Sequence, residues 1–130
     1  MFDLSTIAID LFLVALGSIL GAFLRFEILN TFNYKKISKH WLIFTINIIS
    51  CFLLGLLVAL DKRLTTLVYS QLLLFIGVGF LGSFSTFSSF IWEVFDHWKN
   101  DDKSQSLLII ASSILGGFVF LLFGYHLGNG

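Results

Sequence analysis

The chain has no proline, only one cysteine and few charged residues (12%) among its 130 residues. Without proline, an interruption of a helix has to come from glycine, serine or threonine. The lone Cys51 excludes an internal disulfide, and its apolar neighbours predict a packed thiol rather than a reactive one. The formal net charge is zero, which argues against nucleic acid as a partner.

Apolar residues dominate the remaining composition. Hydrophobic residues make up 57% of the chain and the mean hydropathy is +0.93, which is more apolar surface than a soluble domain of this size needs. Four apolar stretches are each long enough, at roughly 20 residues, to cross a lipid bilayer as a helix. The sequence therefore predicts an all-α membrane protein with one domain over residues 1–130 and spans at about 7–26, 40–60, 67–95 and 107–127.

The third span contains the most unusual composition, in the run from Gly77 to Phe90. The middle of this run consists of glycine, serine, threonine and phenylalanine instead of leucine and valine. Irregular backbone at membrane depth is tolerated only where protein buries it or a water-filled cavity reaches it. Phe87 and Phe90 are three residues apart and lie close to one helical face. We therefore expect a functional break in the third helix, with two aromatic rings beside it.

Polar and aromatic side chains within the spans each allow two interpretations. Arg25 either snorkels to headgroups or pairs with Glu27 or a loop carboxylate, or it attracts anions at a vestibule. Asn47 either joins neighbouring helices by hydrogen bonds or donates to an anion on its path. Phe87 and Phe90 either pack against protein and lipid or present their electropositive ring edges to a small anion.

No motif supports enzymatic chemistry. Ser85 and Ser88 have no nearby base in the sequence that would make either a nucleophile. The glycines form no phosphate-binding loop, and His40, His97 and His126 show no metal-ligand spacing among themselves. The sequence predicts that the protein is not an enzyme.

Three motifs accompany the four-span length: Gly21-Ala22-Phe23-Leu24-Arg25, Asn47 followed by Cys51-Phe52-Leu53-Leu54-Gly55, and Gly82-x-x-Ser85-Thr86-Phe87-Ser88-Ser89-Phe90. With these features the chain resembles the Fluc (CrcB) family of fluoride channels over essentially its whole length. The third-span motif is similar to the family's Gly-x-x-Thr/Ser-Thr-Phe-Ser-Thr-Phe and is the most specific feature. The resemblance implies passive, fluoride-selective export across the cell membrane, which lowers cytoplasmic fluoride.

The same resemblance implies an antiparallel dimer of two four-helix subunits, with two narrow fluoride pathways built from both. A helix break leaves carbonyls without intrahelical partners, and a hard cation takes oxygen ligands. By position, the resemblance makes Arg25 a vestibule or structural residue and gives the backbone carbonyls of Gly82 and Ser85 to a structural sodium ion at the dimer centre. The pore-lining residues that it implies are Asn47, Phe87, Phe90, Ser88 and Ser113.

The chain departs from the family pattern in two places. Leu42 and Ile43 stand where members have Gly-Thr, and the positions that follow Ser113 at four-residue intervals, Gly117 and Leu121, carry no hydroxyl. One of the two pores is therefore predicted to be impaired in a homodimer.

Loop charge bears on the identity of the second subunit. Lys/Arg-rich short loops stay cytoplasmic, so the larger number in the first and third loops favours both termini outside. The bias is modest, so both a dual-topology homodimer and a pair with an oppositely oriented paralogue stay open. Because some bias is present, the paralogue pair is slightly favoured. The first and third loops hold Lys35, Lys36, Lys39, Lys99 and Lys103, and the middle loop holds Lys62 and Arg63.

Two other functions stay open on the sequence. A small proton-coupled exporter of cationic drugs needs a carboxylate embedded in the membrane, for which Asp10, Glu27 and Glu93 are poor candidates because they lie near span ends. A non-transporting membrane assembly protein is the other, but it would need no hydroxyl-rich break in the third span.

Overall fold

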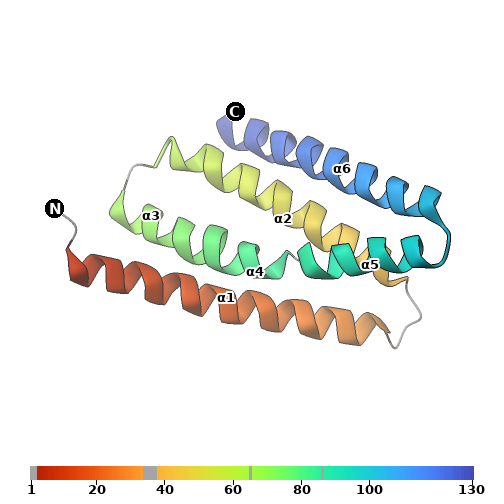
Figure 1. The fold of residues 1–130 in the computed structure, drawn as a ribbon. Coiled ribbons are helices and arrows are strands. Elements are labelled where there is room, and N and C mark those ends of the chain that lie inside the picture. Colours follow the sequence, from red (N-terminus) through yellow and green to blue (C-terminus); the bar gives the residue numbers. More distant parts are fainter. Residues whose placement is uncertain (1–2, 34–37, 65, 86) are drawn as a thin grey trace.

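The computed structural model describes residues 3–33, 38–64, 66–85 and 87–130. Within these ranges the chain is helical throughout, apart from short connections (Figure 1). Of the residues singled out above, Lys35, Lys36 and Thr86 lie outside the described part of the chain.

Four long helical rods make up the molecule, and all four are long and apolar enough to cross a membrane. The predicted four-span, all-α architecture is therefore confirmed, and each predicted span falls within one rod. The rods extend past the predicted limits because their polar ends continue the helix beyond the apolar stretch. Their bounds are α1 (Leu4–Asn33), α2 (Lys39–Asp61), the third rod with α3 (Leu67–Leu72), η1 (Leu73–Leu81), α4 (Gly82–Phe84) and α5 (Phe87–Lys99), and α6 (Lys103–Asn129).

Polar side chains mark where the helices begin. Thr66 accepts a hydrogen bond from the Tyr69 backbone N–H at 3.2 Å at the start of α3. Asp102 accepts one from the Gln105 backbone N–H at 3.3 Å at the start of α6. Such caps satisfy backbone donors that have no partner within the helix.

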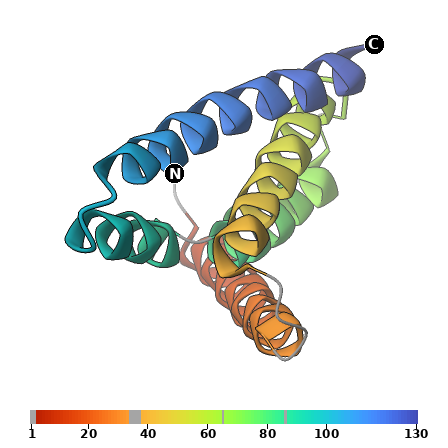
Figure 2. The ribbon, with the colours of Figure 1, turned by 90° about the vertical axis from the view of Figure 1, so that its right-hand side faces the viewer.

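The bundle consists of two helix pairs whose backbones approach closely at glycines. α2 packs chiefly on α6, whereas α1 packs on η1 and α4, and α6 lies on the side of the molecule opposite α1 (Figure 2). A Cβ on Gly21 would collide with the Phe80 carbonyl oxygen, and a Cβ on Gly55 with the Leu121 carbonyl oxygen. Small residues at such crossings allow the dense packing that holds helices together in lipid.

The third rod is widened before it is interrupted. Leu73–Leu81 forms a π-helix, a form that occurs mostly as single-turn bulges, often at functional sites. Ser85 then leaves the helical path with φ −68° and ψ 147°, and α5 begins at Phe87. The predicted interruption is present, and it begins at Ser85. Gly82 itself keeps helical angles, with φ −62° and ψ −34°.

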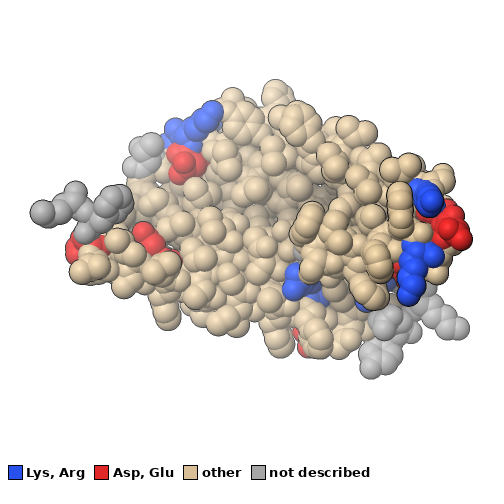
Figure 3. Space-filling view, viewed as in Figure 1, with Lys and Arg blue, Asp and Glu red and all other residues tan. Residues whose placement is uncertain are grey.

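Most charged side chains gather toward the two ends of the bundle, with broad uncharged surface between them (Figure 3). At one end, Lys62 donates a hydrogen bond to the Tyr125 hydroxyl and lies over the same ring. Arg63 donates to the Asn129 carbonyl at 2.6 Å. These contacts attach the end of α6 to the segment that follows α2.

Candidate functional site

Six of the residues predicted to form the pore or the ion site meet at one groove, which we call the central groove. It lies between α2, the third rod and α6, has a volume of about 360 Å³ and is open on one side. Its remaining walls come from Ser50, Cys51, Leu54, Gly77, Leu81 and Ile114. The predicted residues that line it are Asn47, Gly82, Ser85, Phe87, Phe90 and Ser113.

The aromatic pair stands at the start of α5, directly after the interruption. The Phe87 and Phe90 ring centroids are 6.2 Å apart and the planes are inclined by 42°. Phe87 is 76% exposed, whereas Phe90 is half-buried. The interruption therefore places two rings at the groove, one of them largely uncovered by its own chain.

The hydroxyl groups that line the groove differ in whether they donate a hydrogen bond to a backbone carbonyl. The Ser50 hydroxyl donates to the Ile46 carbonyl at 2.8 Å, and the Ser85 hydroxyl donates to the Leu81 carbonyl at 2.9 Å. Within the described residues, the half-buried Ser113 hydroxyl on α6 makes no such bond. Ser113 is therefore the hydroxyl that can donate into the groove without giving up a backbone partner.

The end of α4 offers backbone oxygens at the same groove. The last carbonyls of a helix lack the donors that a further turn would supply, and Ser85 follows α4 in an extended conformation. Gly82 is exposed, and a Cβ there would meet nothing within 4 Å. Gly82 is thus accessible from outside this chain, whereas Ser85 is half-buried.

Two predicted residues do not line the central groove. Ser88 is exposed on α5, and Arg25 is half-buried on α1. No ion pair to Arg25 occurs among the described residues, so the pairing with Glu27, one of the alternatives for this residue, is not formed.

A second cavity, the side cavity, adjoins the groove because Phe90 and Ser113 line both. Its volume is about 510 Å³, and its walls come from α2, α5 and α6. It contains two groups that can bind a cation, His40 on α2 and Glu93 on α5.

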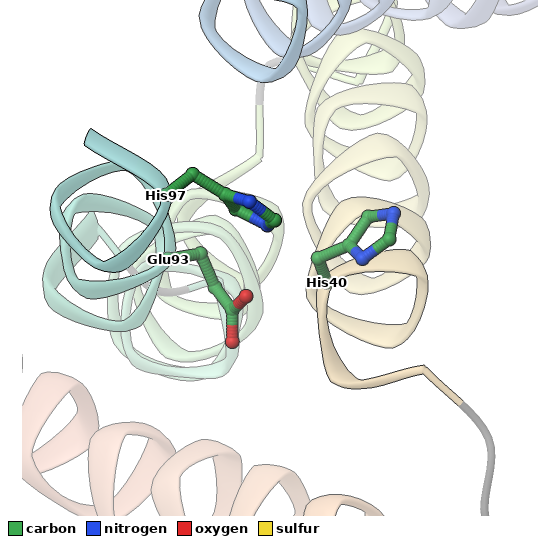
Figure 4. A group of neighbouring side chains, drawn as sticks. All are labelled: His40, Glu93 and His97. Atoms are coloured by element: carbon green, nitrogen blue, oxygen red, sulfur yellow. The ribbon is translucent and has the colours of Figure 1, made fainter. Parts of the chain in front are cut away.

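These two groups join His97 in a cluster that sequence reasoning missed. One ring nitrogen of each histidine and one carboxylate oxygen of Glu93 all lie within 4.8 Å of one another (Figure 4). The three histidines show no metal-ligand spacing in the sequence, and the fold nevertheless brings His40 and His97 together with Glu93. Glu93 and His97 are four residues apart and share a helix face, which is a signal in the sequence. The approach of His40 depends on how α2 packs on α5.

Comparison with known proteins points to one family. Residues 12–125 match the family described as "CrcB-like protein, Camphor Resistance (CrcB)". The chain is 40% identical to "Fluoride-specific ion channel FluC 1" of Prochlorococcus marinus (strain MIT 9313) over the whole of both proteins. It is 38% identical to "Fluoride-specific ion channel FluC 2" of Prochlorococcus marinus (strain NATL2A), over 92% of this chain and 98% of that protein. It is 32% identical to "Fluoride-specific ion channel FluC 2" of Clostridium acetobutylicum, over 92% and 95%.

Proposed function

The chain belongs to the CrcB (FluC) family of fluoride-specific ion channels, and on this basis we propose that it exports fluoride passively across the cell membrane. The full-length match to a fluoride-specific channel carries this conclusion. The four membrane-spanning rods agree with it, and the family consists of channels, not enzymes. The drug exporter is set aside, because no carboxylate lines the central groove among the described residues. The assembly protein is set aside because the family conducts ions.

The central groove has the chemistry that a fluoride pathway needs. Asn47 and Ser113 are neutral donors at its wall, and the edges of the Phe87 and Phe90 rings are electropositive. No lysine or arginine lines the groove among the described residues. An anion that must bind and then leave is better served by several weak donors than by a fixed charge.

A single chain leaves this pathway incomplete. Within a bilayer, polar backbone and side chains must be shielded from lipid, yet the groove is open on one side and Phe87 is 76% exposed. We propose that a second, antiparallel subunit covers the groove, so that two fluoride pathways form at the interface. The second subunit is either an identical chain or an oppositely oriented paralogue.

The sodium ion that the resemblance implies fits the backbone at the interruption. Gly82 and Ser85 would offer carbonyl oxygens, which a hard cation prefers, and the exposure of Gly82 leaves its backbone open to a partner. When bound, the ion supplies positive charge for the helix-end carbonyls. Its role is structural, since the ligands belong to the main chain of a helix end.

Fluoride efflux from liposomes that contain only this chain tests the proposal. Fluoride should leave down its gradient while chloride is retained, and the membrane potential should drive the flux with about 2.3 kcal/mol per charge per 100 mV. A requirement for a proton gradient would contradict a passive channel. Activity that appears only after a paralogue is added would identify the heterodimer as the working form.

A further inference from the structure

We propose that His40, Glu93 and His97 form a binding site for a transition-metal ion, with Zn²⁺ as the preferred occupant. The three ligand atoms lie within 4.8 Å of one another, and all three residues are half-buried. The cluster stands at the beginning of α2 and near the end of α5. It is separate from the backbone oxygens at Gly82 and Ser85.

The spacing of the ligand atoms is close to that of a zinc centre. Zinc bonds of 2.0–2.2 Å in a tetrahedron set ligand atoms about 3.3 Å apart. The cluster therefore has to contract by at most about 1.5 Å, given its limit of 4.8 Å. Rotation about side-chain bonds supplies such a movement without any shift of the helices.

Rigid elements hold the ligands near this geometry before a metal arrives. Glu93 and His97 are four residues apart on α5 and project toward α2, where His40 lies in the first turn (Figure 4). The two imidazole rings meet edge to face, with centroids 6.3 Å apart and an interplanar angle of 87°. Because two packed helices already hold the ligands, metal binding requires little further loss of conformational freedom.

The Glu93 carboxylate gives an independent reason to expect a cation. It is half-buried on the wall of an otherwise largely apolar cavity. Among the described residues it forms no ion pair and no hydrogen bond. A carboxylate partly removed from water and left without a partner is stabilised when a cation binds.

Two polar groups flank the histidines in the manner of outer ligands. The Ser38 hydroxyl oxygen is 2.8 Å from His40 Nδ1, and an Asp102 carboxylate oxygen is 4.0 Å from His97 Nδ1. Partners that accept a hydrogen bond from the second ring nitrogen orient imidazole ligands and raise their basicity; the Asp102 oxygen, at 4.0 Å, lies beyond hydrogen-bond distance of His97. Both groups come from segments that directly precede a helix.

The ligand set selects the metal. Two imidazoles and one carboxylate suit Zn²⁺ and its first-row neighbours, whereas Mg²⁺ and Ca²⁺ prefer oxygen ligands alone. Three protein ligands leave the fourth tetrahedral position to water. The side cavity of about 510 Å³ gives room for that water and a route of entry.

Metal titration of the purified, untagged chain in detergent tests the proposal. Co²⁺ should produce the visible absorption of a tetrahedral site, and Zn²⁺ should displace it with one ion bound per chain. Glu93→Gln and His97→Ala should each weaken Zn²⁺ binding at least about 100-fold, because loss of an outer partner alone costs 10–100-fold. His126→Ala, at the exposed far end of α6, is the matched control and should bind as the unaltered chain does.

Helix content and elution volume show whether each variant is folded, and Glu93→Gln keeps the size and shape of the side chain. An unaltered chain that binds no Co²⁺ would overturn the proposal. The proposal would also be overturned if Glu93→Gln and His97→Ala bound Zn²⁺ as tightly as the unaltered chain does. Loss of Zn²⁺ binding in His126→Ala would overturn it as well. Metal binding is measured without fluoride, so its failure would leave the channel function untouched.

Discussion

Replacing the two rings at the central groove one at a time tests the pathway most directly. Phe87→Ile and Phe90→Ile keep an apolar side chain but remove the electropositive ring edge. We expect both variants to assemble as the unaltered protein does and to carry fluoride more slowly. The matched control is Phe118→Ile on α6, whose ring is 63% exposed and lines neither of the two cavities.

The size of the effect follows from the weakness of the contact. Specific contacts of aromatic rings are worth about 0.5–1.5 kcal/mol beyond simple burial. Loss of that amount at the highest barrier slows transport by about two- to tenfold for each ring, since 1.4 kcal/mol corresponds to a factor of ten. Stability should change less than transport, because Phe87 is 76% exposed and a hydrophobic swap of similar volume costs under about 1.5 kcal/mol.

Initial rates of fluoride efflux from liposomes, at equal protein density, measure the effect. Thermal unfolding in detergent, recorded in parallel, separates a transport defect from a folding defect. Wild-type rates in both groove variants would refute the assignment of these rings to the pathway. So would a loss of transport confined to Phe118→Ile.

Four further changes test the packing and the interruption. Gly21→Ala forces a Cβ into the Phe80 carbonyl oxygen and should lower the free energy of unfolding by about 1–3 kcal/mol. The new Cβ of Gly82→Ala meets nothing within 4 Å in its own chain, so the melting temperature should stay unchanged or rise slightly. Ser106→Ala removes a fully buried hydroxyl that donates to the Val94 carbonyl at 2.9 Å and should cost about 1 kcal/mol, measured as a lower melting temperature. If the protein is more stable in sodium than in a large organic cation, Ser85→Ala should keep this difference, because the proposed ligand is the main-chain oxygen. Loss of the difference in this variant would assign the ion to the Ser85 side chain.

Hydropathy was sufficient to predict the four rods, because each span must satisfy its backbone hydrogen bonds within itself. The interruption was also predictable, since a run of small polar residues is unusual in the middle of an apolar span and frees the backbone to leave the helix. The position of the interruption at Ser85 was harder to predict, because the nearby glycine, Gly82, keeps helical angles and does not mark it. The π-helix over Leu73–Leu81 leaves no mark in composition, since its residues are apolar or glycine.

Contacts between distant segments mark the limit of prediction from the sequence. Asn47 and Phe90 were singled out for their own chemistry and Ser113 from the family resemblance, and their meeting at one groove depends on three helices packing together. His40 and His97 lie on different spans, so their approach could not be inferred from spacing. The sequence signal for the cluster was confined to Glu93 and His97.

The interruption in the third rod accounts for both parts of the proposed site, the main-chain oxygens for sodium and the aromatic ring of the fluoride pathway. Because α4 ends at Phe84 and α5 begins at Phe87, the same interruption ends the hydrogen bonding of the first helix, whose last carbonyls lack intrahelical partners, and sets an aromatic ring at the start of the next helix. Both features belong to the lining of the central groove, where the chain itself leaves Phe87 and Gly82 exposed. A second subunit placed there would shield the ring, the oxygens and the groove at once. A partner on any other face would leave all three in contact with lipid, which is the arrangement that a membrane protein has to avoid.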